Sequence, residues 1–235
     1  MVNEEMRVFK KTNMIGFMLS MSLIIKWAKD NGIAVGFARG SCSGSTVAYL
    51  TDITDVDPVI RHTVFSRFCN EDRVELGDVD CDFYEDDRPK IYKHIIDTFG
   101  EKKTSYIVAF GTLADKSVID VIGKAFSVMC NNGRRDSSYS LKEIADIKKQ
   151  WDKDRESTRE KYEDIFYFYD GLVGCEITQS MHPAGILVSS VDITSFCGNF
   201  YGENKLGETV LISNIDMEEC HDLNLVKYDI LGLKS

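Results

Sequence analysis

Residues 75–83 read Glu-Leu-Gly-Asp-Val-Asp-Cys-Asp-Phe and place three aspartates, Asp78, Asp80 and Asp82, at alternate positions. Side chains two residues apart in a strand point to the same face of a sheet. The stretch therefore predicts a strand over about 74–83, with carboxylates on one face and apolar side chains on the other. Such a row is either a solvated edge strand or a site for hard divalent cations, which prefer oxygen ligands.

The segments around this strand predict helices and strands in alternation. Apolar periodicity and stop signals indicate helices over about 4–30, 46–50, 59–68, 88–99 and 140–153. Another helix is expected to begin at about 112, and one more follows the 140–153 helix and ends at about 170. Two of these helices begin with the spacing of a capping box, Thr112 with Asp115 and Ser140 with Glu143. Short apolar runs predict strands at 33–35, 105–110, 186–188, 210–212 and 226–230. This mixture predicts an α+β (mixed α/β) fold in which helices flank a mixed sheet.

Composition narrows the class of protein. The chain has 235 residues and a net charge of -10, which argues against binding nucleic acid through overall basicity but leaves room for a local basic groove. Seven cysteines without a C-x-x-C pair favour reduced thiols in a cytoplasmic protein over a disulfide framework or a zinc site. The apolar run at 14–25 is too short to span a bilayer, so we expect a buried helix and no membrane partner.

A turn rich in glycine and serine lies between a predicted strand and a predicted helix, at residues 39–45. Glycines let the backbone approach a ligand, and free amides at a helix N-terminus suit phosphate. Arg39 adds a positive charge, and Ser41 and Ser45 add hydroxyls. No G-K-[ST] follows, so this is not a P-loop, and an ordinary connector has the same composition.

Asp229 is a lone acid in an apolar predicted strand, and a buried aspartate needs a partner. Lys227, two residues earlier on the same face, could form a plain ion pair with it. The alternative partner is a metal ion shared with Asp78 and Asp80. A glycine-serine turn, a D-x-D strand and a distant aspartate together resemble the nucleotidyltransferase layout, in which three carboxylates hold two Mg²⁺ ions.

Longer motifs make the resemblance specific. The chain resembles the palm region of the bacterial replicative DNA polymerase III alpha subunit, a family C DNA polymerase. Family members read roughly W-A-K-x-x-G-I-x-V-G-P-G-R-G-S-A-A-G-S-x-V-A-Y, and residues 27–49 read WAKDNGIAVGFARGSCSGSTVAY. Further matches, in family order, are ITDVDP at 53–58, RFCNEDR at 67–73, GDVDCDF at 77–83, FGTLADKSVI at 110–119, HPAGILV at 182–188 and KYDILGLK at 227–234.

The resemblance implies a polymerase beta-like nucleotidyltransferase fold that adds deoxynucleotides from dNTP to a primer 3′ end on template DNA. The implied catalytic residues and ligands of two Mg²⁺ ions, which Mn²⁺ could replace, are Asp78, Asp80 and Asp229. The implied nucleotide-binding residues are Arg39, Gly40, Ser41, Ser45 and Lys227. Residues given a secondary role are Asp82, His182, Arg67 and Arg73. Gly77, Phe37-Ala38 and Pro183 depart from the family pattern, but none of these changes removes a metal ligand.

The same resemblance predicts the domain organisation. We expect residues 1–235 to form a single palm domain with a charged helical insertion at about 131–171. The family's phosphoesterase-like, fingers, clamp-binding and OB-fold domains are expected to be absent, so further polymerase domains or subunits, such as fingers and a sliding clamp, are expected partners. The alternatives are a palm-fold assembly module that is inactive without a partner, and a nucleotidyltransferase acting on a small molecule or RNA.

Overall fold

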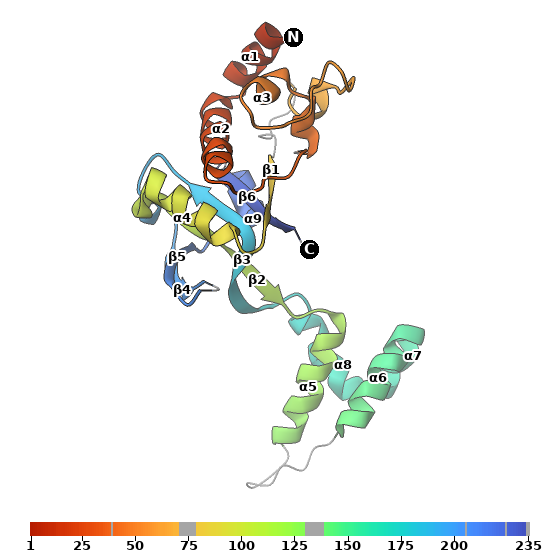
Figure 1. The fold of residues 1–235 in the computed structure, drawn as a ribbon. Coiled ribbons are helices and arrows are strands. Elements are labelled where there is room, and N and C mark those ends of the chain that lie inside the picture. Colours follow the sequence, from red (N-terminus) through yellow and green to blue (C-terminus); the bar gives the residue numbers. More distant parts are fainter. Residues whose placement is uncertain (39, 71–78, 130–138, 205, 224, 234–235) are drawn as a thin grey trace. The chain divides into compact units, whose positions relative to one another are not determined.

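The computed structural model describes residues 1–38, 40–70, 79–129, 139–204, 206–223 and 225–233. The chain divides into two compact units, one of residues 1–109 and 181–235 and the other of residues 110–180 (Figure 1). Each unit has its own cluster of buried apolar side chains. Each unit is therefore described separately, with its own core.

The first unit contains most of a mixed sheet and the helices that flank it (Figure 1). Its elements are α1 (Val2–Lys11), α2 (Ile15–Asp30), η1 (Gly40–Gly44), α3 (Thr46–Leu50), η2 (Phe65–Arg67), β1 (Asp80–Tyr84), α4 (Arg88–Phe99), η3 (Glu101–Lys103), β2 (Thr104–Thr112), β3 (Glu176–Val188), η4 (Ile193–Ser195), β4 (Asn199–Glu203), β5 (Thr209–Ser213), α9 (Met217–Asp222) and β6 (Val226–Leu233). Among the described strands the sheet order is β1-β6-β3-β2-β5-β4. The predicted α+β class with a mixed sheet is confirmed.

Strand pairing brings distant parts of the sequence together. β1 runs parallel to β6, with Asp80 opposite Asp229 and Asp82 opposite Leu231. β3 runs antiparallel to β6 on its other side, with Gly185 opposite Asp229. At the far end of the sheet β5 pairs parallel with β2 and antiparallel with β4. The carboxylate strand is therefore the edge strand of the sheet; among the described residues it pairs with β6 and, through a single bridge at Phe83, with Val35.

The two faces of the sheet have different coverings. Helices α2 and α4 pack on the face that carries Tyr228, whose ring lies 5.5 Å from that of Phe17 and 6.3 Å from that of Phe99. The apolar residues of the aspartate strand are buried, as the alternation predicts: Val79, Cys81 and Phe83. The opposite face carries a second cluster formed by Ile107, Leu187, Ile193, Ile215 and Cys220.

The helix predicted over 4–30 is wrong in one respect, because it is two helices. The chain turns at Asn13, whose φ of 58° lies in the left-handed region, and α1 and α2 meet at 114°. The bend lets both helices bury apolar side chains, among them Phe9 and Met21. No single helix in the described ranges is long and apolar enough to cross a membrane, although the bent pair would qualify by length and composition.

Three further predictions differ from the structure. The segment predicted as a helix at 59–68 is mainly turns, with only the short η2 at its end. Thr112 ends β2 and does not cap a helix, since α5 begins at Asp115. β3 begins ten residues earlier than the predicted strand at 186–188, because its first half is exposed and lacks the apolar run that marks a buried strand.

The second unit is mainly helical and also contains the end of β2 and the start of β3. Its elements are α5 (Asp115–Met129), α6 (Leu141–Lys153), α7 (Arg155–Lys161) and α8 (Glu163–Leu172). Buried residues from α5, α6 and α8 form its core, including Ile119, Ile147 and Phe166. The capping box predicted at Ser140 and Glu143 is confirmed, with both reciprocal hydrogen bonds present. Most of the charged segment predicted at about 131–171 lies in these helices.

Candidate functional site

Two of the predicted catalytic aspartates meet on the sheet. Asp80 of β1 and Asp229 of β6 are register partners on neighbouring parallel strands, although they are 149 positions apart in sequence. Neighbouring strands lie about 4.8 Å apart, and register partners point to the same face. The two carboxylates are therefore held at a spacing suited to binding one ligand together.

The Asp229 carboxylate is only partly satisfied. The residue is 9% exposed, and its Oδ2 accepts a hydrogen bond from Lys227 Nζ at 2.8 Å. Its Oδ1 is buried and has no hydrogen-bond partner among the described residues. The ion pair with Lys227, one of the two alternatives that the sequence left open, is therefore present. It leaves one buried oxygen whose desolvation is uncompensated, which is the state expected of a ligand oxygen.

The described part of the chain contains two of the three predicted metal ligands, Asp80 and Asp229. No group of three or more histidine, cysteine, aspartate or glutamate side chains suited to a metal ion occurs within it. Asp82 lies on the same face as Asp80, but its register partner is Leu231, two residues beyond Asp229 in β6. The third predicted ligand, Asp78, lies outside the described residues. Asp80 and the free oxygen of Asp229 form an all-oxygen donor pair, which fits Mg²⁺.

The glycine-serine turn is held beside this pair of carboxylates. Val35 forms an antiparallel bridge with Phe83, and the Gly36 amide donates to the Asp82 carbonyl at 2.9 Å. These contacts bring Gly40 to β1, where a Cβ atom on Gly40 would lie 3.5 Å from Asp80 Oδ2. Gly40 has a φ of 51°, which a residue with a side chain adopts only with strain. Glycine at this position therefore serves the left-handed backbone of the turn, which runs at ordinary contact distance from the Asp80 carboxylate.

The turn lines a pocket of about 190 Å³. Its lining includes Gly40, Ser41 and the side chain of Arg67, so the structure brings together three of the predicted site residues. A Cβ atom on Gly44 would lie 2.6 Å from the Val64 carbonyl oxygen, which shows why a glycine is needed where the two segments meet. Arg67 is exposed and forms no ion pair within the described ranges, so its guanidinium is available to an anion.

Ser45, predicted to bind nucleotide, has a different environment. It is fully buried, its hydroxyl donates to Glu5 Oε2 at 2.7 Å, and it accepts from the Ala48 amide as the N-cap of α3. The Glu5 carboxylate also accepts from the amides of Thr46 and Val47, both at 3.0 Å. The expectation that the α3 N-terminus offers its amides to phosphate is therefore wrong, because the Glu5 carboxylate occupies them. Its negative charge takes the place that a phosphate would need.

His182 lies close to the aspartates. Its Nδ1 accepts from the Gly185 amide at 2.9 Å, and Gly185 is the register partner of Asp229. Burial lowers the pKa of His182, with Asp229 opposing and Lys227 assisting that shift. The ring is therefore neutral near pH 7 and carries its proton on Nε2, because Nδ1 is an acceptor.

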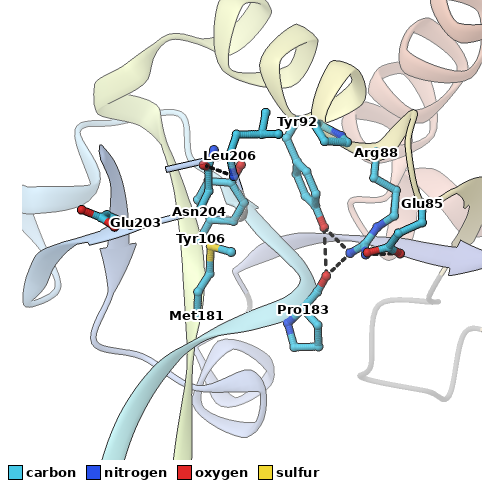
Figure 2. Close-up of a pocket in the computed structure, with 10 residues that line it drawn as sticks. Glu85, Arg88, Tyr92, Tyr106, Met181, Pro183, Glu203, Asn204 and Leu206 are labelled. Carbon is cyan, nitrogen blue, oxygen red and sulfur yellow. Dashed lines mark hydrogen bonds and ion pairs between the residues drawn. The ribbon is translucent and has the colours of Figure 1, made fainter. Parts of the chain in front are cut away.

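Arg88 is a residue beside the site that the sequence patterns did not indicate. It is 6% exposed, its Nε donates to the Ile230 carbonyl at 3.0 Å, and its Nη2 donates to the Pro183 carbonyl (Figure 2). These carbonyls belong to the residues next to Asp229 and His182, so Arg88 ties the two strands together beside the site. The only sequence signal was an arginine at the start of a predicted helix, a position that solvated arginines commonly occupy.

Two remaining predicted residues, Arg39 and Arg73, lie outside the described residues, as Asp78 does. Their roles stay predictions.

Comparison with known proteins assigns the family. Residues 1–232 match the family described as the bacterial DNA polymerase III alpha NTPase domain, and the chain belongs to that family. It is 30% identical over 98% of its length to the DNA polymerase III subunit alpha of Campylobacter jejuni, and 33% identical over 94% to that of Borreliella burgdorferi. The corresponding Escherichia coli protein is 30% identical over 98% of the chain. The chain spans about a fifth of the length of these relatives, 20%, 19% and 20% respectively.

Proposed function

We propose that this chain forms the palm of a DNA-directed DNA polymerase and joins a dNTP to a primer 3′ end on template DNA. The observation that carries the proposal is the register pairing of Asp80 with Asp229, together with the unpaired buried Oδ1 of Asp229. A buried carboxylate oxygen without a partner costs about 1–3 kcal/mol, so its retention favours a ligand that is bound during function. Membership of the polymerase III alpha family supports the same reading.

In this proposal Asp78, Asp80 and Asp229 would hold two Mg²⁺ ions, which would activate the attacking hydroxyl and stabilise the leaving pyrophosphate. The chain's own residues supply the positions. β1 and β6 fix the two described carboxylates at the spacing of neighbouring strands, and Lys227 balances part of their charge. The third carboxylate, that of Asp78, lies outside the described residues and is proposed from the sequence alone.

Phosphate recognition is assigned to the turn and not to the α3 N-terminus. Gly40 and Ser41 provide backbone and hydroxyl groups beside Asp80, and Arg67 provides a positive charge on the pocket wall. Arg39 stays a proposed contributor. The neutral His182 can donate one hydrogen bond from Nε2 to a phosphate or to the primer terminus while its other nitrogen is held by the backbone.

Manganese binding tests the metal site directly. We expect Mn²⁺ titration, followed by electron paramagnetic resonance, to show binding that Asp229→Asn and Asp80→Asn each weaken at least about tenfold. Asp52→Asn is the matched control, because Asp52 is exposed and asparagine tolerates its left-handed backbone. Equal Mn²⁺ affinity in all three variants contradicts the proposal.

The second candidate is a palm module that is inactive without a partner polypeptide. The chain spans about a fifth of its relatives' length. Primer extension by the chain alone with Mg²⁺ separates the two, since extension excludes the inactive module. If extension occurs only after a polypeptide with the remaining regions of a relative is added, the module is correct.

A further inference from the structure

A second pocket, of about 350 Å³, lies between α4, β2, β3 and the turn after β4 (Figure 2). Its walls are largely apolar. The rings of Tyr92 and Tyr106 pack 5.1 Å apart, and Met181, Pro183 and Leu206 complete the walls. It shares no lining residue with the pocket at the glycine-serine turn, and it contains neither Asp80 nor Asp229. It is therefore separate from the proposed polymerase site.

Arg88, the arginine among the described lining residues, is unavailable to an anionic ligand. Arg88 Nε donates to the Ile230 carbonyl, Nη1 to Glu85 Oε2 at 3.0 Å and Nη2 to the Tyr92 hydroxyl at 2.9 Å, with a further bond to the Pro183 carbonyl. The Tyr92 hydroxyl in turn donates to the Ala184 carbonyl at 3.0 Å. These groups are used to hold the strands together (Figure 2). The positive charge of Arg88 is thus balanced by Glu85, and its N–H donors are used in hydrogen bonds within the fold.

The charge that remains available is negative. Glu203 is exposed at the pocket rim, and its carboxylate forms no ion pair with any residue that the structure describes. A neighbouring groove of about 640 Å³ shares Pro89, Tyr106 and Asn204 with the pocket. Described acidic residues lining the two are Glu85, Asp97, Glu101, Asp192, Glu203 and Glu208, and the described basic ones are Arg88, Lys93 and Lys102. Carboxylates therefore outnumber cations along this surface, which favours a cationic occupant.

We propose that the pocket binds an arginine or lysine side chain of a partner polypeptide, which continues along the groove. The aliphatic stem would pack on Met181 and Leu206, and the charged head would pair with Glu203 at the rim. The pocket volume lies at the low end of the range for ligand sites, which suits one long side chain.

The length of the groove favours a polypeptide over a free amine as the occupant of the pocket. It extends the pocket along α4 and β5, and it is flanked by Tyr201, which is 76% exposed. Exposed tyrosines are common contact residues at protein interfaces. A free amine would fill the pocket and leave this flanking surface unused.

The test uses the full chain labelled with ¹³C at its methionine methyl groups, so that Met181 reports on the pocket. The probes are a capped pentapeptide with a central arginine, its uncharged citrulline counterpart, and agmatine as the free cation. We expect the arginine peptide to shift the Met181 methyl signal and the citrulline peptide to bind about three- to fivefold more weakly, as expected for an exposed ion pair. Agmatine should bind more weakly than the peptide.

Glu203→Gln should reduce the arginine peptide to the affinity of the citrulline peptide. Glu218→Gln, which changes an exposed glutamate of α9 outside both cavities, should leave it unchanged. No Met181 shift, equal binding of the two peptides, or equal effects of the two variants overturns the proposal. If agmatine binds as tightly as the arginine peptide, the proposal of a polypeptide partner is wrong and the pocket is assigned to a free cation.

Discussion

Asp115 and Asp229 are both acids beside apolar side chains, one in each unit, and they differ in how many of their carboxylate oxygens accept hydrogen bonds. Asp115 Oδ1 accepts from Trp151 Nε1 at 2.6 Å and from the Tyr169 hydroxyl, and Oδ2 accepts from Arg155 at 2.7 Å. Both oxygens are used, at the start of α5 where negative charge is favourable. Asp229 has one used oxygen and one buried oxygen without a described partner. The first arrangement stabilises a fold, and the second leaves capacity for a ligand.

The largest expected effect comes from removing the partner of Asp229. Lys227→Met leaves a carboxylate that is 11% exposed without its cation, and breaking such a pair costs about 3 kcal/mol of unfolding free energy. Urea unfolding, followed by hydrogen exchange of β6 amides, measures the loss. Saturating Mg²⁺ should recover part of it, because a bound cation replaces the missing charge. A loss that Mg²⁺ does not change would mean that Asp229 is structural, as Asp115 is.

A smaller loss is expected at Asp115. Asp115→Ala leaves the buried Trp151 indole N–H without its acceptor and removes the bond from Tyr169, at a cost of about 2 kcal/mol. Trp151 fluorescence in a Trp27→Phe background reports on the helical unit during unfolding. Asp152→Ala, which removes an exposed ion pair with Lys116, is the control and should change the unfolding free energy by less than about 0.5 kcal/mol. Mg²⁺ should have no effect on either variant.

Acid should weaken the two units in different pH ranges. Burial lowers the pKa of His182, so the unfolded chain binds a proton more readily, and stability in the first unit falls as pH drops below about 6.5. At Asp115 burial opposes the change, but the hydrogen bonds from Tyr169 and Trp151 outweigh it and lower the pKa. Its contribution is therefore complete above about pH 4 and is lost below that value. NMR titration of both groups checks the order, and a His182 pKa above 6.5 contradicts it.

The smallest effect is expected for Arg155→Met. Arg155 is 68% exposed on its side chain, and Asp115 keeps two other donors, so the change should cost at most about 0.5 kcal/mol. The same Trp151 fluorescence assay measures it. The contrast with Lys227→Met isolates the difference between a redundant partner and a single one. A cost as large as that of Lys227→Met would remove the distinction between the two aspartates.

Local signals predicted several elements well. Helix α4 has an apolar stripe at helical spacing and ends at Gly100, whose φ of 99° suits glycine. The Ser140 capping box depends on residues three positions apart, so it can be recognised without tertiary information. Where local signals conflicted with packing they failed, as at Asn13, where the bend lets two helices share one core. The Thr112 and Asp115 spacing failed because Asp115 is recruited by the α6 and α8 side chains instead.

For the site, alternation along the chain determined that Asp80 and Asp82 share a face opposite the buried Val79, Cys81 and Phe83. The motifs also indicated that Asp229 belongs with them, but no local pattern could say which aspartate it meets. The tertiary structure decided that Asp80 is its register partner, that Lys227 satisfies one of its oxygens, and that Glu5 fills the α3 N-terminus. The reason is physical: side-chain alternation is set by neighbouring residues, whereas strand register and the satisfaction of a buried carboxylate depend on groups far away in sequence.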